Sequence, residues 1–415
     1  MAHSSNQSSD RNASDARLSD DMMRSQSASD EELSWQADLR AQDEAMRKRF
    51  RGCLVGGAVG DALGAPVEFM NHSQIVQEFG QDGIQDYVPA FGKLGAITDD
   101  TQMTLFTAEG MLRAYVRGRM RGLSTFTGVT DHAYQRWLQT QGEKSQVKDV
   151  SRSGWLWRYK ALHSRRAPGL TCIAALQAKR AFGDMADNDS KGCGGVMRIA
   201  PVGMFAWHER DREDTAQRYF DVACDLAGLT HGHPTGMLTA GVLAVLVLRL
   251  LQGETLEFAL REARQILVTR QARYGSGSEC AETASAIDQA VKLAGSGVEP
   301  GPEQVEKLGQ GWVAEEALAI SIYCALVAKD FEHGITLAVN HGGDSDSTGA
   351  ITGNLLGAML GIDAIPARWR KPLELARVIQ SMADDLYDYP SWNIGEYLLD
   401  GDNDNERINK RYPGW

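Results

Sequence analysis

Cysteine is scarce in this chain and follows no recognisable spacing. The six residues are scattered along it, at Cys53, Cys172, Cys193, Cys224, Cys280 and Cys324. The Cys-x-x-Cys pairs of zinc and redox sites are absent, and so is the dense cysteine framework of small secreted domains. A disulfide scaffold is therefore excluded, and we expect a protein of the reducing cytoplasm.

Long hydrophobic runs and an excess of positive charge are also missing. The longest apolar run, 241–251, is much shorter than the roughly 20 residues that a membrane-spanning helix needs. The N-terminus is polar and charged, so we expect neither a signal peptide nor a membrane anchor. The formal net charge of −12 argues against a nucleic-acid or anionic-membrane surface. Small molecules or proteins are the expected partners.

Strand signals are rare as well, and positions 84–88 carry the best of a weak set. Apolar residues instead recur at helical spacing in segments rich in Ala and Leu. These segments are 103–116, 216–226, 237–251, 256–268, 280–293, 313–327, 350–360 and 372–386. Repeats of about 20 to 50 residues are not evident, which excludes a solenoid, and 275–278 and 295–302 are typical of loops. The sequence predicts one compact, all-α, multi-helix domain over residues 46–415.

Residues 1–45 form a separate, polar extension. Up to about residue 29 it consists mainly of Ser, Asp, Asn, Gln and Arg, so we expect it to be disordered when alone. From Asp30 onward the composition is compatible with a helix, with Leu33 and Trp35 as its first large apolar residues. Two interpretations remain open: a leader helix that packs on the domain, or a segment that docks onto a partner.

Two acidic clusters lie far apart in the chain, each directly before a helical segment. The first comprises Thr98, Asp99, Asp100 and Thr101, and the second, within 341–349, comprises Asp344, Asp346, Ser347 and Thr348. Either cluster alone is explained by helix capping, because Asp, Ser and Thr satisfy free backbone N–H groups. Capping needs only one or two side chains, so two clusters of paired carboxylates exceed that need.

Paired carboxylates can coexist near one another when a cation or a proton offsets their repulsion. Carboxylates and hydroxyls form an all-oxygen ligand set, which suits Mg²⁺, Mn²⁺ or Ca²⁺. Two octahedral ions roughly 3.5 to 4 Å apart would resolve the repulsion and leave water-filled positions for a substrate. The residues therefore predict a magnesium site built from both ends of one domain.

A glycine loop, Gly192, Cys193, Gly194 and Gly195, lies before residues 196–201. We expect this loop to enter a helix, so that its bare backbone can approach a phosphate closely and the helix end adds favourable charge, although a plain helix-entry turn is an equal alternative. His231 and His233 lack a third metal ligand nearby, so a hydrogen bond from His231 to a substrate, or structural roles, are favoured over zinc. Cys193 has no evident activating base, which argues against a nucleophile.

Five segments together resemble the ADP-ribosylglycohydrolase family and occur in its order over about residues 49–390. They are 52–64 with Glu68, 98–101, 192–198, Thr230 with His231, and 342–347. The resemblance implies an all-α fold with a binuclear Mg²⁺ or Mn²⁺ centre. The residues that match its metal ligands are Thr98, Asp99, Asp100, Asp344, Asp346 and Ser347.

The resemblance also implies roles around a bound ADP-ribose. Glu68 matches an acidic residue near the metals that influences substrate entry, with an ordinary surface carboxylate as the alternative. The loop from Gly192 to Gly195 and His231 match segments that surround the ADP-ribose, although many relatives have Asn where Cys193 stands. A water oriented by metal or carboxylate would attack the anomeric carbon, and we expect loss of Asp100 or Asp346 to be most severe.

The implied function is a metal-dependent hydrolase that removes ADP-ribose from modified proteins, with arginine as the first choice of acceptor and serine as an alternative. Some relatives are immunity proteins against ADP-ribosyltransferase toxins. A second hypothesis is therefore a binding protein that inhibits a toxin through residues 1–45. A relative without activity, as among lens crystallins, is disfavoured by the intact aspartates, and a regulator of nitrogen fixation usually lacks such an extension.

Overall fold

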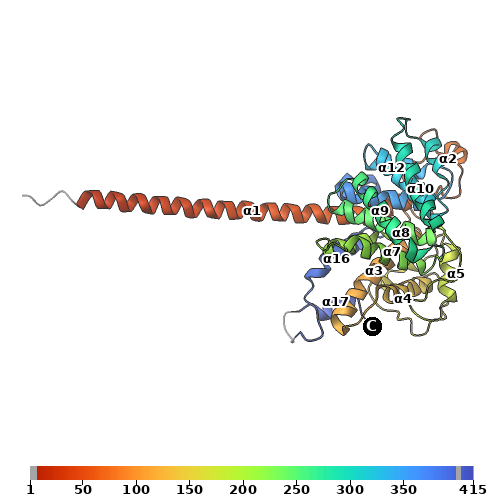
Figure 1. Ribbon diagram of the computed structural model, residues 1–415, viewed down its shortest axis with the longest axis horizontal. Helices are drawn as coiled ribbons and strands as arrows, with labels where there is room; N and C mark the ends of the chain where they lie inside the picture. The colour runs from red at the N-terminus through yellow and green to blue at the C-terminus, as the bar shows by residue number, and fades with distance from the viewer. Residues whose placement is uncertain (1–6, 276, 399–402, 415) are drawn as a thin grey trace, which may run out of the picture. The chain divides into compact units, whose positions relative to one another are not determined.

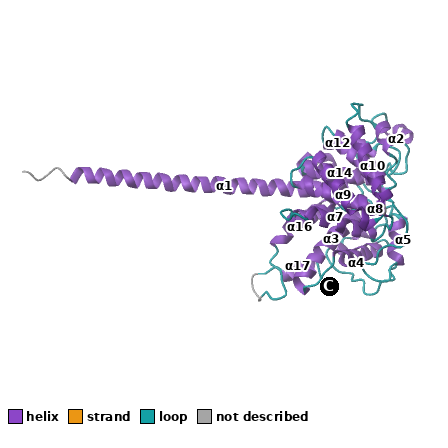
Figure 2. Cartoon of the chain, viewed as in Figure 1, coloured by secondary structure: helices purple, strands orange, loops and turns teal. Residues whose placement is uncertain are grey.

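The computed structural model describes residues 7–275, 277–398 and 403–414, and their side chains from Trp35 onward except at residue 271. Within this described part every regular element is a helix (Figure 2). The β-type pairing among the described residues is limited to two isolated bridges. The prediction of an all-α fold is confirmed. The weak strand signal at 84–88 corresponds to irregular backbone.

The helices follow one another along the chain, and the longest connections are 80–98, 141–169 and 179–199 (Figure 1). The first are α1 (Gln7–Gly64), α2 (His72–Phe79), α3 (Asp99–Arg121), α4 (Phe126–Thr140), α5 (Leu170–Ala178), α6 (Ala200–Ala206), α7 (Thr215–Gly228) and α8 (Pro234–Leu251). The others are α9 (Leu256–Tyr274), α10 (Gly277–Ala294), α11 (Pro302–Val305), α12 (Ala314–Val327), α13 (Phe331–Val339), α14 (Ser345–Leu360), α15 (Ala367–Arg370), α16 (Ala376–Asp388) and α17 (Asn405–Arg411).

The chain divides into two compact units, Met1–Arg47 and Lys48–Trp415. In the first unit the chain is helical from Gln7, and its described apolar side chains Trp35 and Leu39 are exposed. The helix expected from Asp30 therefore extends further toward the N-terminus. Disorder of residues 1 to about 29 in isolation stays a prediction, and residues 1–6 lie outside the described part.

Helix α8 is the centre of the second unit. It packs against α6, α7, α9, α10, α12 and α14. Among the described residues it is the one helix long and apolar enough to cross a membrane, yet 83% of it is buried inside the fold. Burial on all sides is the property of a core helix, since a helix at a protein surface needs only one apolar face.

A seam of glycines joins the end of α1 to α14. The facing pairs are Gly52 with Gly357, Gly56 with Gly353, and Gly60 with Gly349. A Cβ on Gly60 would lie 2.0 Å from the carbonyl oxygen of Gly349, so only glycine permits this backbone approach. The seam ends where Gly64 meets Ser345, and it therefore brings the end of α1 to the beginning of α14.

Some helix boundaries differ from the predicted ones for identifiable reasons. Helix α16 begins at Ala376 rather than near residue 372, because Leu375 has a positive φ of 56°, which interrupts helical backbone. The loop expected at 275–278 is shorter, since α10 begins at Gly277, and Ser276 lies outside the described residues. Helix α3 is longer than predicted, because Thr98 caps its start and Gly122, with a φ of 71°, ends it.

Candidate active site

A pocket of about 440 Å³ opens where α3 and α14 begin. Its lining brings together the two acidic clusters, the glycine loop and Glu68. The predicted residues that line it are Glu68, Asp99, Asp100, Gly192, Cys193, Gly194, His231, Asp344, Asp346 and Ser347. Thr98 and Gly195 are buried next to it without being part of its wall.

On the α3 side, Thr98 caps the helix, since its hydroxyl accepts from the N–H of Asp100 at 3.3 Å. The two aspartates that follow do not act as caps. Asp99 accepts from the N–H of Gly169 at 3.1 Å, and Oδ1 of Asp100 is buried without a hydrogen-bond partner. An unpartnered, buried carboxylate oxygen is costly and marks a place for a ligand.

On the α14 side, Asp344 occupies the N-cap position but its side chain makes no cap hydrogen bond. Instead it accepts from the thiol of Cys193 at 2.7 Å. Asp346 lies in the first turn and accepts from the N–H of Ser347 at 3.0 Å. The capping explanation thus accounts for Thr98 and leaves the carboxylates of both clusters facing the pocket.

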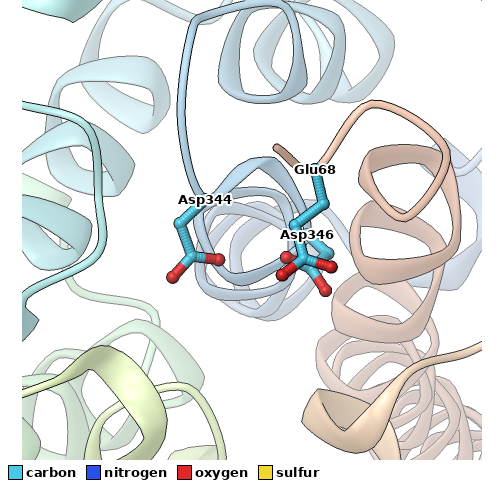
Figure 3. A group of neighbouring side chains, drawn as sticks. All are labelled: Glu68, Asp344 and Asp346. Atoms are coloured by element: carbon cyan, nitrogen blue, oxygen red, sulfur yellow. The ribbon is translucent and has the colours of Figure 1, made fainter. Parts of the chain in front are cut away.

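Glu68 completes the acidic group from a third segment, the turn that follows α1. Figure 3 shows the carboxylates of Glu68, Asp344 and Asp346 turned toward one another. One ligand atom of each lies within 4.8 Å of the others. This spacing is compatible with shared coordination of a cation, because calcium and magnesium bind carboxylate oxygens at roughly 2.0 to 2.6 Å.

Burial raises the pKa of every carboxyl group in this cluster, and repulsion from neighbouring carboxylates raises it further in Glu68, Asp99, Asp100 and Asp344. Burial first, and then the charge of Asp346, raises the pKa of Glu68 to about 10. The same two causes, in the same order, raise the pKa of Asp100 well above its usual value. The carboxylates favour a bound cation or protons in the pocket, because their charges cannot otherwise coexist at this burial.

The donor set fits hard divalent cations. The pocket wall offers carboxylates and hydroxyls, with a buried Asp100 oxygen left unsatisfied, and among its described residues it contains no Lys or Arg to neutralise them. The two histidines do not alter this assignment, since Nδ1 of His233 accepts from the N–H of Thr235 at 3.1 Å. This donor chemistry fits a hard divalent cation better than zinc.

Asp61 is a site residue that the sequence reasoning did not single out. It is fully buried in α1, and its carboxylate accepts from the backbone N–H groups of Thr98, at 3.0 and 3.1 Å, and of Thr101, at 3.1 Å. These bonds hold the start of α3 against the end of α1. Burial, then Asp346, raises its pKa to about 7. An acidic residue inside the apolar run 52–64 is the signal that could have revealed it.

The glycine loop is organised differently from the prediction. It forms a short 3₁₀ turn, Cys193–Gly195, and the next α-helix begins only at Ala200, so the loop does not sit at a helix N-terminus. Instead it is tied to the segment before α12, since the N–H of Cys193 donates to Trp312 at 3.1 Å and that of Ala314 to Lys191 at 2.8 Å. This pairing positions Gly192 and Gly194 in the pocket wall.

His231 lies against the same loop. A Cβ on Gly194 would meet its ring at 2.9 Å, which explains the need for glycine there. Its Nδ1 is 2.9 Å from the hydroxyl of Thr230, which in turn accepts from Arg198 at 2.7 Å. Burial, and then the Arg198 charge, lowers the pKa of His231 to about 3. The imidazole is therefore neutral and oriented.

Cys193 is not built as a nucleophile. Burial, followed by the charge of Asp344, raises the pKa of its thiol well above the usual value. The thiol donates to Asp344 and accepts from Ser347 at 3.5 Å. A protonated thiol bound to a carboxylate has little nucleophilic character, so its contribution is to orient Asp344.

The fold and the pocket define an all-α protein with an acidic site at the start of two helices. Residues 42–394 match the model of the family described as ADP-ribosylglycohydrolase. The chain belongs to the ADP-ribosylglycohydrolase family, as its sequence motifs predicted.

The similarity to relatives of named activity extends over most of the chain. The ADP-ribosyl-[dinitrogen reductase] glycohydrolase of Rhodospirillum rubrum is 25% identical, over 82% of this chain and 96% of the relative. The ADP-ribosylarginine hydrolase Tri1 of Serratia proteamaculans is 26% identical, over 84% of this chain and 81% of the relative. A solved structure, an ADP-ribosylglycohydrolase-related protein complex, is similar with a TM-score of 0.57, 26% identity and coverage of 83% and 98%.

Proposed function

We propose that this protein is a metal-dependent hydrolase that releases ADP-ribose from modified proteins, with ADP-ribosyl-arginine as its first substrate. Family membership supports hydrolysis of an ADP-ribosyl bond. The arginine linkage is supported by the similarity to Tri1 of Serratia proteamaculans, an ADP-ribosylarginine hydrolase. The observation that carries the proposal is the convergence of both acidic clusters and Glu68 in one pocket, with a buried Asp100 oxygen left unsatisfied.

The proposed cofactor is a pair of Mg²⁺ ions, with Mn²⁺ as an alternative. The residues that would hold them are Thr98, Asp99, Asp100, Asp344, Asp346 and Ser347. When bound, such ions offset the carboxylate charge and stabilise developing negative charge on the substrate.

The chain's own groups account for the remaining steps. Gly192 and Gly194 let the backbone approach the diphosphate, and neutral His231 offers a hydrogen bond beside it. The free oxygen of Asp100 orients a water toward the anomeric carbon as the N-glycosidic bond breaks through an oxocarbenium-like transition state. The hydroxyl of this water adds to the anomeric carbon, and the proton that the water loses passes by way of Asp100 to the departing guanidine.

The test is release of free ADP-ribose from an arginine-ADP-ribosylated protein with and without Mg²⁺. We expect release that depends on the metal and falls by at least two orders of magnitude in Asp100→Ala and Asp346→Ala, the scale at which loss of transition-state stabilisation is felt. Asp211→Ala, a change at an exposed turn outside the pocket, is the matched control. Wild-type turnover in either pocket variant would contradict the assigned roles.

Serine-linked ADP-ribose is the alternative substrate, because the acidic clusters do not by themselves distinguish the acceptor. Both linkages occur on proteins, so an ADP-ribosylated protein is the proposed partner in either case, and the cytoplasm the proposed location. Parallel assays on arginine- and serine-linked substrates decide between them. Release from the serine linkage alone would replace arginine in the proposal.

A second proposed role is protection against an ADP-ribosyltransferase toxin through residues 1–45. The supporting observation is that Trp35 and Leu39 expose 64% and 43% of their surface on the helix of the first unit. Large exposed apolar side chains are typical of surfaces that bind proteins. Hydrolysis and toxin binding are separable in this hypothesis, because the pocket lies wholly in the second unit.

A further inference from the structure

Two aromatic side chains mark the opening of the acidic pocket. The rings of Phe69 and Trp312 are stacked, with centroids 5.3 Å apart and an interplanar angle of 20°. Both residues line the pocket, and both reach solvent, with 71% and 36% of their surfaces exposed. A ring that lines a pocket and is also this exposed lies at its mouth, where it meets whatever projects out of the pocket.

The backbone holds both rings in place. Phe69 follows Glu68 directly in the turn after α1 and has a positive φ of 70°, an uncommon conformation for a bulky residue. Trp312 belongs to the segment that pairs with the glycine loop, since its carbonyl accepts from the N–H of Cys193 at 3.1 Å. The stack therefore joins the turn that carries Glu68 to the segment that pairs with the glycine loop.

The charge around this stack favours a cation. The described residues that line the pocket include five carboxylates, from Glu68, Asp99, Asp100, Asp344 and Asp346, and neither Lys nor Arg. An aromatic face attracts a cation through its quadrupole, and an adjacent carboxylate adds to that attraction. A planar cation is complementary to the exposed faces of these rings, and no Lys or Arg among the described lining residues would repel it.

We propose that the stacked pair of Phe69 and Trp312 receives the guanidinium of the ADP-ribosylated arginine and so selects arginine over uncharged acceptors. The inference rests on the proposed hydrolase function and assigns its acceptor specificity to these residues. The ribose and diphosphate occupy the acidic interior, while the guanidinium, the group attached to the anomeric carbon, projects toward the opening. A serine acceptor has no charge for the rings to recognise.

The experiment compares kcat/KM for arginine-linked and serine-linked ADP-ribosyl peptides in Phe69→Leu and Trp312→Leu. Leucine keeps apolar bulk and removes the π face. We expect kcat/KM for the arginine-linked peptide to fall roughly three- to thirtyfold, the range that corresponds to a cation–π contact. The serine-linked value should change less than twofold, and ADP-ribose should bind as tightly as it does to the wild type.

Two further variants serve as controls. Leu170→Ala truncates another side chain of the pocket wall that is 79% exposed but carries no ring, and it should leave the ratio of the two kcat/KM values unchanged. Trp312→Phe restores an aromatic face and should recover most of the arginine preference. Equal losses on both substrates, or weaker binding of ADP-ribose, would overturn the inference and place the stack against the adenine or ribose instead.

A binding measurement separates this inference from the proposed function. Agmatine, which carries a free guanidinium, is titrated calorimetrically into protein saturated with Mg²⁺ and ADP-ribose. Weaker agmatine binding in Trp312→Leu than in the wild type supports the guanidinium site even if the wild type does not cleave the arginine linkage. Equal agmatine binding in both proteins, or no binding to the wild type, overturns the inference whatever the hydrolysis assay shows.

Discussion

Asp61 illustrates how a residue outside the pocket determines what the pocket can do. Its carboxylate accepts the N–H groups of Thr98 and Thr101, and thereby sets where α3 begins. The direction in which Asp99 and Asp100 point depends on that starting position. Groups that orient ligating side chains in this way often affect metal affinity as strongly as some ligands do.

We predict that Asp61→Asn weakens metal binding without unfolding the protein. An amide keeps one oxygen that can accept a hydrogen bond, but its NH₂ group would face the N–H of Thr101, which is also a donor. Because two donors cannot bond to each other, we expect the start of α3 to shift. The expected loss of Mn²⁺ affinity is about 10- to 100-fold, measured by electron paramagnetic resonance of free Mn²⁺. Asp288→Asn, at an exposed ion pair with Arg264, is the control. Unchanged affinity in Asp61→Asn would show that its hydrogen bonds do not position the ligands.

A buried histidine predicts acid sensitivity of the fold. Nε2 of His132 accepts from the N–H of Ser151 at 2.9 Å. Burial, then the charges of Arg136 and Arg113, lowers its pKa from 6.5 to about 3. The unfolded chain therefore binds a proton that the folded chain excludes. The stability contributed by neutral His132 is complete above about pH 6.5 and is lost as the pH falls toward 3.

We predict that His132→Gln flattens the acid limb of stability, because an amide oxygen can accept the same hydrogen bond without titrating. Between pH 6.5 and 4 the free energy of unfolding should fall by up to about 1.4 kcal/mol less per pH unit than in the wild type. Urea unfolding across this range measures the difference. Other buried histidines keep their own pH dependence, so parallel curves for the two proteins would exclude His132 as a source.

At the level of helices, the seam between α1 and α14 joins the elements that carry the site. Glycines at every fourth position of both helices allow backbone contact, and the contact ends next to Asp346, where a Cβ on Gly64 would meet its N–H at 2.5 Å. The same contact brings Asp61 of α1 and Glu68 of the turn after it toward Asp344 and Asp346 at the start of α14. The site therefore depends on the absence of side chains along the seam.

We predict that Gly60→Ala destabilises the protein by about 1 to 3 kcal/mol or more, because its methyl group would lie 2.0 Å from a backbone oxygen that cannot move alone. Metal affinity should fall with it, since the start of α14 is displaced. Thermal unfolding and Mn²⁺ titration measure the two effects. Gly277→Ala, in the first turn of α10 where a Cβ meets nothing within 4 Å, should instead be neutral or slightly stabilising.

Over the entire chain, the candidate active-site pocket and the N-terminal extension belong to different compact units. The pocket and the glycine seam are formed by described residues of Lys48–Trp415. This organisation predicts that hydrolysis survives removal of the extension.

We predict that deleting residues 1–45 leaves the melting temperature of the remaining protein unchanged. Its kcat/KM should stay within about twofold of that of the full chain. If the extension also binds a toxin, the same deletion abolishes that binding, as measured by surface plasmon resonance with the toxin immobilised. Retained hydrolysis with lost binding supports a dual role. Undiminished toxin binding after deletion would exclude the extension as the binding element.

Local pattern was sufficient for the fold class and for most long helices. Apolar spacing located α7, α8, α9 and α12 to within a few residues, because these helices pack against the core and their spacing records that packing. The predicted segments did not include α2, α4, α5, α6 or α13, and α16 began later than predicted. The start of α16 depends on the left-handed backbone of Leu375, a feature that apolar spacing does not encode.

The chemical character of the site followed from residue types alone, since paired aspartates and hydroxyls specify hard cations wherever they meet. That the two clusters do meet was decided by the tertiary structure, through the glycine seam and the hydrogen bonds of Asp61. The 3₁₀ turn at Cys193 and the stack of Phe69 on Trp312 likewise depend on segments more than 100 residues apart. Contacts of that kind leave no periodic signal in a sequence, because only the packing of the helices brings the residues that make them together.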